Sequence, residues 1–378
     1  MATGPRDSSS LVMLDGWDAT ELEKYQLQDG TSFAAVYNML NAGLSAVNSQ
    51  LYNDPLFSAM VSYQEDPDVE YRVGTSTSMN DFTEYGRPDP QRGSIQGHML
   101  PLKAKDRSLE WTWYYLAKKA RMVQIQTDIA EALKDLRAEW RKSILTRALK
   151  RGDDSGVANN LGSSGYSPGF ATTAASTNVD FTPVEFAGNT FTSTHEHYVA
   201  IAGGAFTAAV FQDAKDELRE HGHEPPYMAI VSSSDESTIR GLTGFTEVDN
   251  LLINYGDDTD RANLPVGAVA SSAAGGYFIG TIEDIAVRVV YGVPQYYGFV
   301  WKSYGPNNPR NPFRIRVQKG MPLQPFFQAF PDPRAGGANY PLQNLMVFSE
   351  WGVGVGEDRT NGTARYTNNA TWADGTAS

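Results

Sequence analysis

The chain has 378 residues, 41% of them hydrophobic and 11% aromatic, which is enough to build the core of one large domain or two ordinary ones. It contains no cysteine, so a disulfide framework, a thiolate metal site and a thiol nucleophile are excluded. The formal net charge of −13 argues against a surface that binds nucleic acid everywhere. No apolar run approaches the roughly 18 residues of a membrane helix and the first residues do not resemble a signal peptide, so we expect a protein with no membrane partner.

The charge is unevenly distributed along the chain. Residues 103–151 hold 13 lysines and arginines against 6 acidic residues, whereas residues 152–214 hold no lysine or arginine. This polarity suits a protein that presents different faces to different neighbours, although a solvated basic helix also accounts for it.

The first element in chain order is a helix expected over residues 32–49. Val36, Leu40 and Leu44 recur there at helical spacing, and Thr31 or Ser32 can cap the start.

Residues 55–117 have the pattern of a long two-stranded arm. The segments "FSAMVSY", "DVEYRV" and "SLEWTWYYL" are typical of strands, and the turn-forming "EYGRPDPQRGS" lies between them. An isolated hairpin is only marginally stable in water, so we expect this arm to lie on a neighbouring subunit.

A long helix follows, expected over 127–150 with Thr127 as its N-cap. The side opposite its apolar stripe carries four basic residues, Lys134, Arg137, Arg141 and Lys142. Residues 152–193 are rich in glycine, serine, alanine and threonine and poor in large apolar residues, which predicts a long loop.

Residues 198–302 are expected to form a compact α+β unit. It starts with a helix over about 206–220 that Gly222 closes, and the strand "YMAIVSS", the helix-like "DESTIRGL" and the strand "AVRVVYGVP" follow. The remainder is strand-rich, with "FRIRV", "LMVFSEWGVGV" and "TARYTN". We expect the last two strands to be joined through a tight turn at Asn361–Gly362.

Three glycines two residues apart, Gly352, Gly354 and Gly356, invite comparison with phosphate-binding loops. Their spacing is wrong for those loops, no helical pattern follows, and Glu357 and Asp358 would repel a phosphate. The alternation of glycine with valine favours a strand that another backbone approaches closely.

Four of the five histidines form two His-x-His pairs, His195/His197 and His221/His223, each beside a glutamate. Four such ligands could hold zinc if they converged. The helix of 206–220, more than about 20 Å long, separates the pairs unless residues 195–203 double back. We therefore expect helix-end and surface histidines and no metal site.

Two further polar segments are interpreted as structural. Residues 256–263, "GDDTDRAN", lack the glycine and the terminal glutamate of a calcium loop, and residues 232–237, "SSSDES", lack a glycine elbow and a base. We expect a solvated turn and a helix cap. The sequence thus predicts no enzyme activity and no cofactor.

The order of these parts resembles the major capsid proteins of tailed double-stranded DNA bacteriophages, which share the Hong Kong 97-type fold. The resemblance covers about residues 30–368, and its most specific segments are "GVGVGEDRTNGTARY" and "ELREHGHEPPYMAIVSSSD". It implies an α+β protein with an N-terminal arm, an extended two-stranded loop, a long spine helix, and peripheral and axial domains.

The resemblance also implies a division of the chain. We expect an N-terminal arm (1–49), a first part of the peripheral domain (50–69) and an extended loop (70–119). A second peripheral part (120–197) holds the spine helix 127–150 and the loop 152–193. An axial domain (198–302), the peripheral C-terminal strands (303–368) and a tail (369–378) follow.

The same resemblance implies that the chain would be a structural protein of the virion, assembled in the host cytoplasm. Its hexamers and pentamers would close an icosahedral shell around double-stranded DNA contacted nonspecifically. A portal, and separate scaffolding or decoration proteins, would be its other partners. Two alternatives remain open: a nanocompartment shell of the same fold, and a metal-dependent enzyme that uses the His-x-His pairs.

Assembly contacts are expected at the tip of the extended loop, at Arg87, Asp89 and Arg92, because a rigid turn rich in proline and glycine holds these charges. Some members of the family weld their shells through a lysine of this loop. No lysine occurs here between Lys24 and Lys103, so we expect no covalent crosslink at the tip.

Overall fold

The structure is a computed structural model that describes residues 27, 29–52, 54–73, 94–119, 121–152, 168–171, 181–247, 276–319, 328–331 and 342–377. The chain divides into two compact units. The first unit comprises residues 1–53, 102–140 and 317–351, and the second unit comprises the rest. Each unit is built from segments far apart in the sequence, so neither forms from one continuous stretch of chain.

In its described residues, the first unit contains two long helices and three strands. The helices are α2 (Phe33–Tyr52) and the first part of α5 (Met122–Leu149). Strand β13 (Leu342–Val355) pairs antiparallel with β4 (Lys103–Thr112) along ten residues and with β12 (Gln328–Pro331) on its other side. The short helix α4 (Trp113–Lys118) follows β4 directly.

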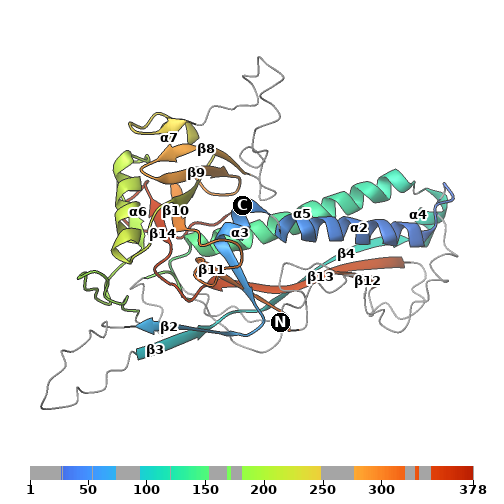
Figure 1. Cartoon of the computed structure of the whole chain (residues 1–378). Coiled ribbons are helices and arrows are strands. Elements are labelled where there is room, and N and C mark those ends of the chain that lie inside the picture. The colour runs from blue at the N-terminus through green and yellow to red at the C-terminus, as the bar shows by residue number, and fades with distance from the viewer. Residues whose placement is uncertain are drawn as a thin grey trace, which may run out of the picture. The chain divides into compact units, whose positions relative to one another are not determined.

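Helices α2 and α5 run side by side (Figure 1). Gly43 of α2 permits this approach, since a Cβ there would lie 2.9 Å from Cδ1 of Leu133. The apolar stripe of α5 is buried, as its 3.6-residue period predicts. Its largest member, Trp140, meets the ring of Trp351 edge to face with the ring centres 4.8 Å apart.

Polar contacts join α5 to strand β4. Lys105 pairs with Glu139 and Arg107 with Asp135, and the indole nitrogen of Trp111 donates to Asp128 across 2.9 Å. Two of the four acidic residues of α5 are therefore matched by cations of the strand beside it.

The second unit contains a seven-stranded mixed sheet in the order β5-β14-β10-β6-β9-β8-β7. The pairs β5–β14 and β6–β9 are parallel, and the other pairs are antiparallel. In chain order the strands are β5 (Tyr198–Ala200), β6 (Tyr227–Val231), β7 (Thr246–Glu247), β8 (Gly276–Ile282), β9 (Ile285–Val290), β10 (Tyr297–Lys302) and β14 (Thr363–Tyr366).

Helix α6 (Ala208–Glu220) packs its apolar side against this sheet. Val210, Phe211, Ala214 and Leu218 are buried with residues of β6, β8, β9 and β10 in one cluster. The short helix α7 (Glu236–Arg240) adds Ile239. Alternating burial along β9 and helical burial along α6 follow directly from their sequence periods.

The second unit also contains the hairpin of β2 (Asp68–Val73) and β3 (Ser94–Met99), which forms a separate two-stranded sheet. Helix α3 (Pro55–Met60) leads into β1 (Val61–Gln64), which pairs in parallel with β11 (Phe313–Val317).

Most expected elements are present, and five expectations are wrong. The two-stranded arm expected over residues 55–117 does not include β4, which pairs with β13, so within the described part of that stretch only β2 and β3 form a hairpin. The segment "FSAMVSY" is not one strand, because its first half lies in α3. Asp54 caps that helix by accepting from the backbone nitrogens of Leu56 and Phe57, and Pro55 stands at its first position.

The strand "SLEWTWYYL" ends at Thr112, and Trp113 and Tyr115 belong to α4. The hydroxyl of Thr112 accepts from the nitrogen of Tyr115 and so starts the helix. Helix α5 begins at Met122, five residues before the expected cap. Thr127 lies inside it and donates its hydroxyl to the carbonyl of Val123.

Asn361–Gly362 does not close a hairpin, because β13 and β14 pair with other strands. The buried Asn361 accepts from the nitrogen of Lys302 and donates to the carbonyls of Lys302 and Arg310. Its side chain therefore fastens neighbouring segments together. Among the described residues, no helix has the length and apolar character needed to cross a membrane.

Candidate functional site

The residues expected at the loop tip, Arg87, Asp89 and Arg92, lie outside the described residues, as does the acidic segment 256–263. The glycine segment is described. Gly352 and Gly354 lie within β13, and a Cβ at Gly356 would come within 2.9 Å of the carbonyl oxygen of Asn311. The predicted strand with a closely approaching backbone is confirmed.

The root of the β2–β3 hairpin is held by a buried arginine, Arg359. Its Nε donates to the carbonyl of Gly169 across 3.2 Å, and its Nη1 donates to the hydroxyl of Tyr71 across 3.1 Å. The guanidinium carbon lies 4.4 Å from the ring centre of Phe181 and 5.3 Å from that of Tyr71. Hydrogen bonds and cation–π contacts thus fix this hairpin to the rest of the second unit.

A second anchor of the hairpin is His98 on β3, whose Nε2 lies 3.1 Å from the carbonyl oxygen of Val355. A carbonyl only accepts, so Nε2 carries the proton. Burial, followed by the positive charge of Arg359, lowers the pKa of His98 to about 3. The neutral side chain is therefore the form that the fold holds.

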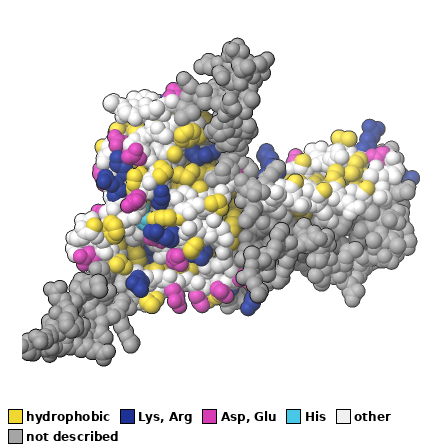
Figure 2. Space-filling model, viewed as in Figure 1, with side chains coloured by type: hydrophobic (Ala, Val, Ile, Leu, Met, Phe, Trp, Pro, Cys, Tyr) yellow, Lys and Arg dark blue, Asp and Glu magenta, His cyan; other side chains and the backbone are white. Residues whose placement is uncertain are grey.

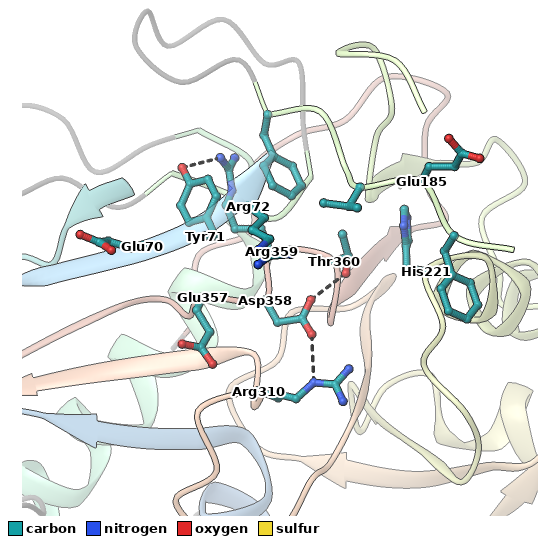
Figure 3. Close-up of a pocket in the computed structure, with 13 residues that line it drawn as sticks. Glu70, Tyr71, Arg72, Glu185, His221, Arg310, Glu357, Asp358, Arg359 and Thr360 are labelled. Carbon is teal, nitrogen blue, oxygen red and sulfur yellow. Dashed lines mark hydrogen bonds and ion pairs between the residues drawn. The ribbon is translucent and has the colours of Figure 1, made fainter. Parts of the chain in front are cut away.

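A pocket of about 450 Å³ opens beside the hairpin root. Asp358 accepts from Thr360 across 2.7 Å and faces Arg310, as Figure 3 shows, and His221 lies at the opposite side from Tyr71. The lining carries both signs of charge, so the pocket does not select an ion of one sign.

Three histidines converge beside this pocket: His195, His197 and His221. The first two immediately precede β5, and the third is the C-cap of α6. The expected separation of the pairs is wrong. Residues 201–207 turn the chain back, with Gly204 in the left-handed region at φ +71°, and α6 returns its end to the start of β5.

The end of α6 has the hydrogen bonds of a Schellman motif. The nitrogen of His223 donates to the carbonyl of Leu218, and that of Gly222 to the carbonyl of Arg219. Gly222 has φ +82°, so it ends the helix as predicted. This motif fixes the backbone at His221, the C-cap of the helix.

The Nε2 atoms of the three histidines lie very close together. They are separated by 3.0 Å between His195 and His197, 2.8 Å between His195 and His221, and 3.0 Å between His197 and His221. The Oε1 atom of Glu220 lies 3.3 Å from Nε2 of His195 and 3.7 Å from Nε2 of His221. Three potential metal-ligand nitrogens thus share one small volume, and a carboxylate oxygen lies beside two of them.

The cluster is largely removed from solvent. The side chains of His221 and His195 are 2% and 18% exposed, and His197 is fully buried. Figure 2 shows histidine at only a small point on this face of the molecule. Burial lowers the pKa of all three histidines, and for His221 to about 2. All three imidazoles are therefore neutral at ordinary pH.

His223 lies outside the cluster, unlike His221, the other member of its His-x-His pair. Its Nδ1 bonds the hydroxyl of Tyr304 across 2.8 Å, and its Nε2 bonds that of Thr360 across 3.0 Å. It is a buried, satisfied core histidine. The expectation of surface histidines is wrong for all four, because each is buried or half-buried.

The glutamate that lies near the cluster is Glu220, and not Glu196, which stands between His195 and His197 in sequence. Glu196 pairs with Arg151 across 2.7 Å. Glu220 was missed, as was Phe191, whose ring centre lies 4.3 Å from that of His221. Glu220 directly precedes His221, which is a sequence signal for it. Phe191 lies in a loop-like segment that gives no such signal.

No protein-family model and no curated protein sequence matches the chain. Among solved structures, the chain is similar to one from Mycobacterium phage Patience, with 18% identity, a TM-score of 0.62 and coverage of 92% of this chain and 91% of that one. Lower similarity is found to the mature capsid of bacteriophage PhiM1, with 12% identity, a TM-score of 0.45 and coverage of 83% of this chain and 87% of that one. For the holo-SrpI encapsulin complex from Synechococcus elongatus PCC 7942 the identity is 11%, the TM-score 0.40 and the coverage 84% of this chain and 87% of that one.

The class of this protein is defined by its fold, which combines a two-unit α+β architecture, the long helix α5 and a two-stranded hairpin. The chain has the Hong Kong 97-type capsid fold. The resemblance seen in the sequence is confirmed at the level of the fold.

Proposed function

We propose that this chain is the major capsid protein of a tailed double-stranded DNA bacteriophage. In this role it assembles as hexamers and pentamers into an icosahedral shell around the packaged genome. It works as a structural protein of the virion and not as an enzyme. Its partners are chiefly further copies of itself.

The observation that carries the proposal is the β2–β3 hairpin. In the part of the chain that the structure describes, these strands pair only with each other, and Ile95 on β3 is 66% exposed. Two strands alone are marginally stable, so the hairpin gains stability by lying on another subunit. The anchor at Arg359 holds its root while leaving its far end for a neighbour.

The similarity to the phage Patience structure over most of both chains supports the proposal through the fold. A portal and separate scaffolding or decoration proteins belong to the proposal as further partners. So do the assignment of residues 198–302 to an axial domain and of 70–119 to an extended loop.

The basic side of α5 is proposed to face the packaged DNA and to contact it nonspecifically. Lys134 and Lys142 are exposed, whereas Arg137 and Arg141 are half-buried. The two lysines should react less with a small amine label in DNA-filled shells than in empty ones. Equal labelling in both would overturn this contact without affecting the shell proposal.

Negative-stain microscopy of the expressed, purified chain tests the proposal directly. We expect closed shells or capsomers, and a compact monomer at high protein concentration would contradict it. The contents of particles from the native source separate the two kinds of shell. Nucleic acid inside supports a capsid, and a protein cargo without nucleic acid would indicate a nanocompartment instead.

Charge reversal tests the proposed contacts of the loop tip, where Arg87, Asp89 and Arg92 would make charge-assisted bonds to an adjacent subunit. Arg92→Glu should lower the yield and heat resistance of particles, and Arg92→Lys, which keeps the charge, serves as the matched control. Normal particles from Arg92→Glu would exclude a role for this residue.

A further inference from the structure

We propose that His195, His197, His221 and Glu220 form a structural zinc site in the second unit. The ligand atoms are Nε2 of each histidine and Oε1 of the glutamate. The site would join the end of helix α6 to the segment that enters strand β5. This inference is independent of the shell function proposed above.

The distances among the three Nε2 atoms fit one tetrahedral ion, and the Glu220 carboxylate lies beside two of them. Zinc lies about 2.0–2.1 Å from imidazole nitrogen and from carboxylate oxygen, so two ligand atoms of a tetrahedral site are about 3.3 Å apart. The three Nε2 atoms are 2.8–3.0 Å apart, and Oε1 of Glu220 lies 3.3 Å from that of His195 and 3.7 Å from that of His221. Shifts of a few tenths of an ångström bring the three nitrogens to the ideal value, and Glu220 completes the site by turning its side chain toward His197.

The imidazole rings point their Nε2 atoms toward a common centre. The three Nε2 atoms are 2.8–3.0 Å apart, whereas the three ring centres are 4.8–4.9 Å apart. The rings therefore spread outward from the nitrogens. Such convergence is the arrangement in which three lone pairs can bind one cation.

The tautomer of His197 makes its Nε2 a ligand. Its Nδ1 lies 2.8 Å from the carbonyl oxygen of Gly362. Because a carbonyl can only accept, Nδ1 carries the proton, and in the neutral ring Nε2 keeps its lone pair. A backbone carbonyl that orients a histidine through its other nitrogen is the usual outer contact of a metal ligand.

Without a cation, hydrogen bonds among the three nitrogens cannot all be satisfied. Each Nε2 of a neutral imidazole is either a donor or an acceptor, and a good contact joins one of each. Each of the three Nε2 atoms contacts the other two, so at least two of them must both be donors or both be acceptors. At least one contact then sets two lone pairs or two hydrogens against each other, whereas a central zinc ion binds all three lone pairs.

The surroundings also suit a structural ion. Phe191 covers the cluster on one side, with ring centres 4.3 Å from His221 and 5.0 Å from His195. Glu220 is 35% exposed and supplies both a negative charge and a route of entry. Three histidines and one carboxylate complete four-coordination, which favours a structural role over a catalytic one with an open position.

Metal analysis of untagged protein tests the inference. Purified wild-type protein, stripped with a chelator and exposed to equimolar zinc, should retain close to one zinc ion per chain after dialysis. His195→Gln removes the most exposed of the three histidines and should lower this content at least tenfold. His98→Gln removes a buried histidine outside the cluster and should leave it unchanged.

Two measurements on the wild type avoid the risk that a variant misfolds. Zinc at about a hundredfold excess over its Kd should raise the melting temperature by about 3 °C. Cobalt(II) bound to the stripped protein should show the strong visible absorption of tetrahedral coordination. Wild-type protein that retains no zinc, or whose melting temperature does not respond to it, would overturn the proposal.

Discussion

The carboxylate of Glu217 accepts a hydrogen bond from Nη2 of Arg365 across 2.6 Å, and both side chains are almost completely buried, at 11% and 2% exposure. The pair joins helix α6 to strand β14. Removing one member leaves the other charge buried without its partner. We expect Glu217→Ala to lower the free energy of unfolding by about 3–5 kcal/mol.

Urea unfolding of the dissociated subunit, followed by tryptophan fluorescence, measures this effect. Glu217→Gln keeps the acceptor oxygen and should cost less. The double variant Glu217→Leu with Arg365→Met removes both charges and should recover much of the loss. A double variant as unstable as Glu217→Ala would show that packing, rather than the unpaired charge, determines the cost.

Replacing the arginine at the hairpin root by lysine should lower the stability of the folded chain. Arg359 bonds Gly169 and Tyr71 and lies against the ring of Phe181. Lysine keeps the charge but lacks the planar fork of donors. We expect Arg359→Lys to cost about 2 kcal/mol and Tyr71→Phe, which removes one hydrogen bond, about 1 kcal/mol. Hydrogen exchange of β2 and β3 should rise in both, and unchanged exchange would argue against anchoring by Arg359.

Substituting Gly222 should destabilise the chain for two reasons. A variant at Gly244 is the matched control that separates them. Its φ is +82°, and a Cβ would lie 2.7 Å from the ring of Phe186. Gly244 has φ +87° with no atom near its Cβ position. Gly244→Ala should therefore show only the backbone strain, roughly 1 kcal/mol, and Gly222→Ala should cost about 2 kcal/mol more. Equal melting temperatures for the two variants would contradict the contact with Phe186.

Acid should destabilise the fold partly through His98. Its pKa is about 3 in the folded chain and about 6.5 when unfolded. The unfolded chain therefore binds the proton first. The contribution of neutral His98 is fully present above about pH 6.5 and is lost as the pH falls toward 3.

At pH 5 this loss amounts to about 2 kcal/mol. His98→Gln keeps a donor toward Val355 and cannot titrate. Its unfolding free energy should consequently fall less between pH 7 and pH 5 than that of the wild type. Parallel declines for the two proteins would show that other groups dominate.

Mature particles should separate into single chains when they are boiled in detergent. The proposed loop tip lacks the lysine that a covalent weld there requires, since none occurs between Lys24 and Lys103. We expect one band near the mass of the chain, 41.4 kDa, on a denaturing gel. A ladder of bonded multimers would contradict this expectation.

The local elements of this protein were determined largely by its sequence. The period of α6, the alternation of β2 and the turn chemistry of Gly222 act over a few residues, so their patterns can be interpreted without the rest of the chain. Two of the errors were also local. The caps of Asp54 and Thr112 start short helices inside segments whose apolar content favours strands.

Only the tertiary structure decided which distant residues meet. Asn361 carries a strong turn signal but serves as a buried link to Lys302, because strands β13 and β14 find better partners elsewhere. The tertiary structure likewise decided that His195 and His221 meet. The sequence placed a helix between them, and its packing against the sheet brought their nitrogens within 2.8 Å. Contacts of this kind depend on where the chain turns back, which no local pattern encodes.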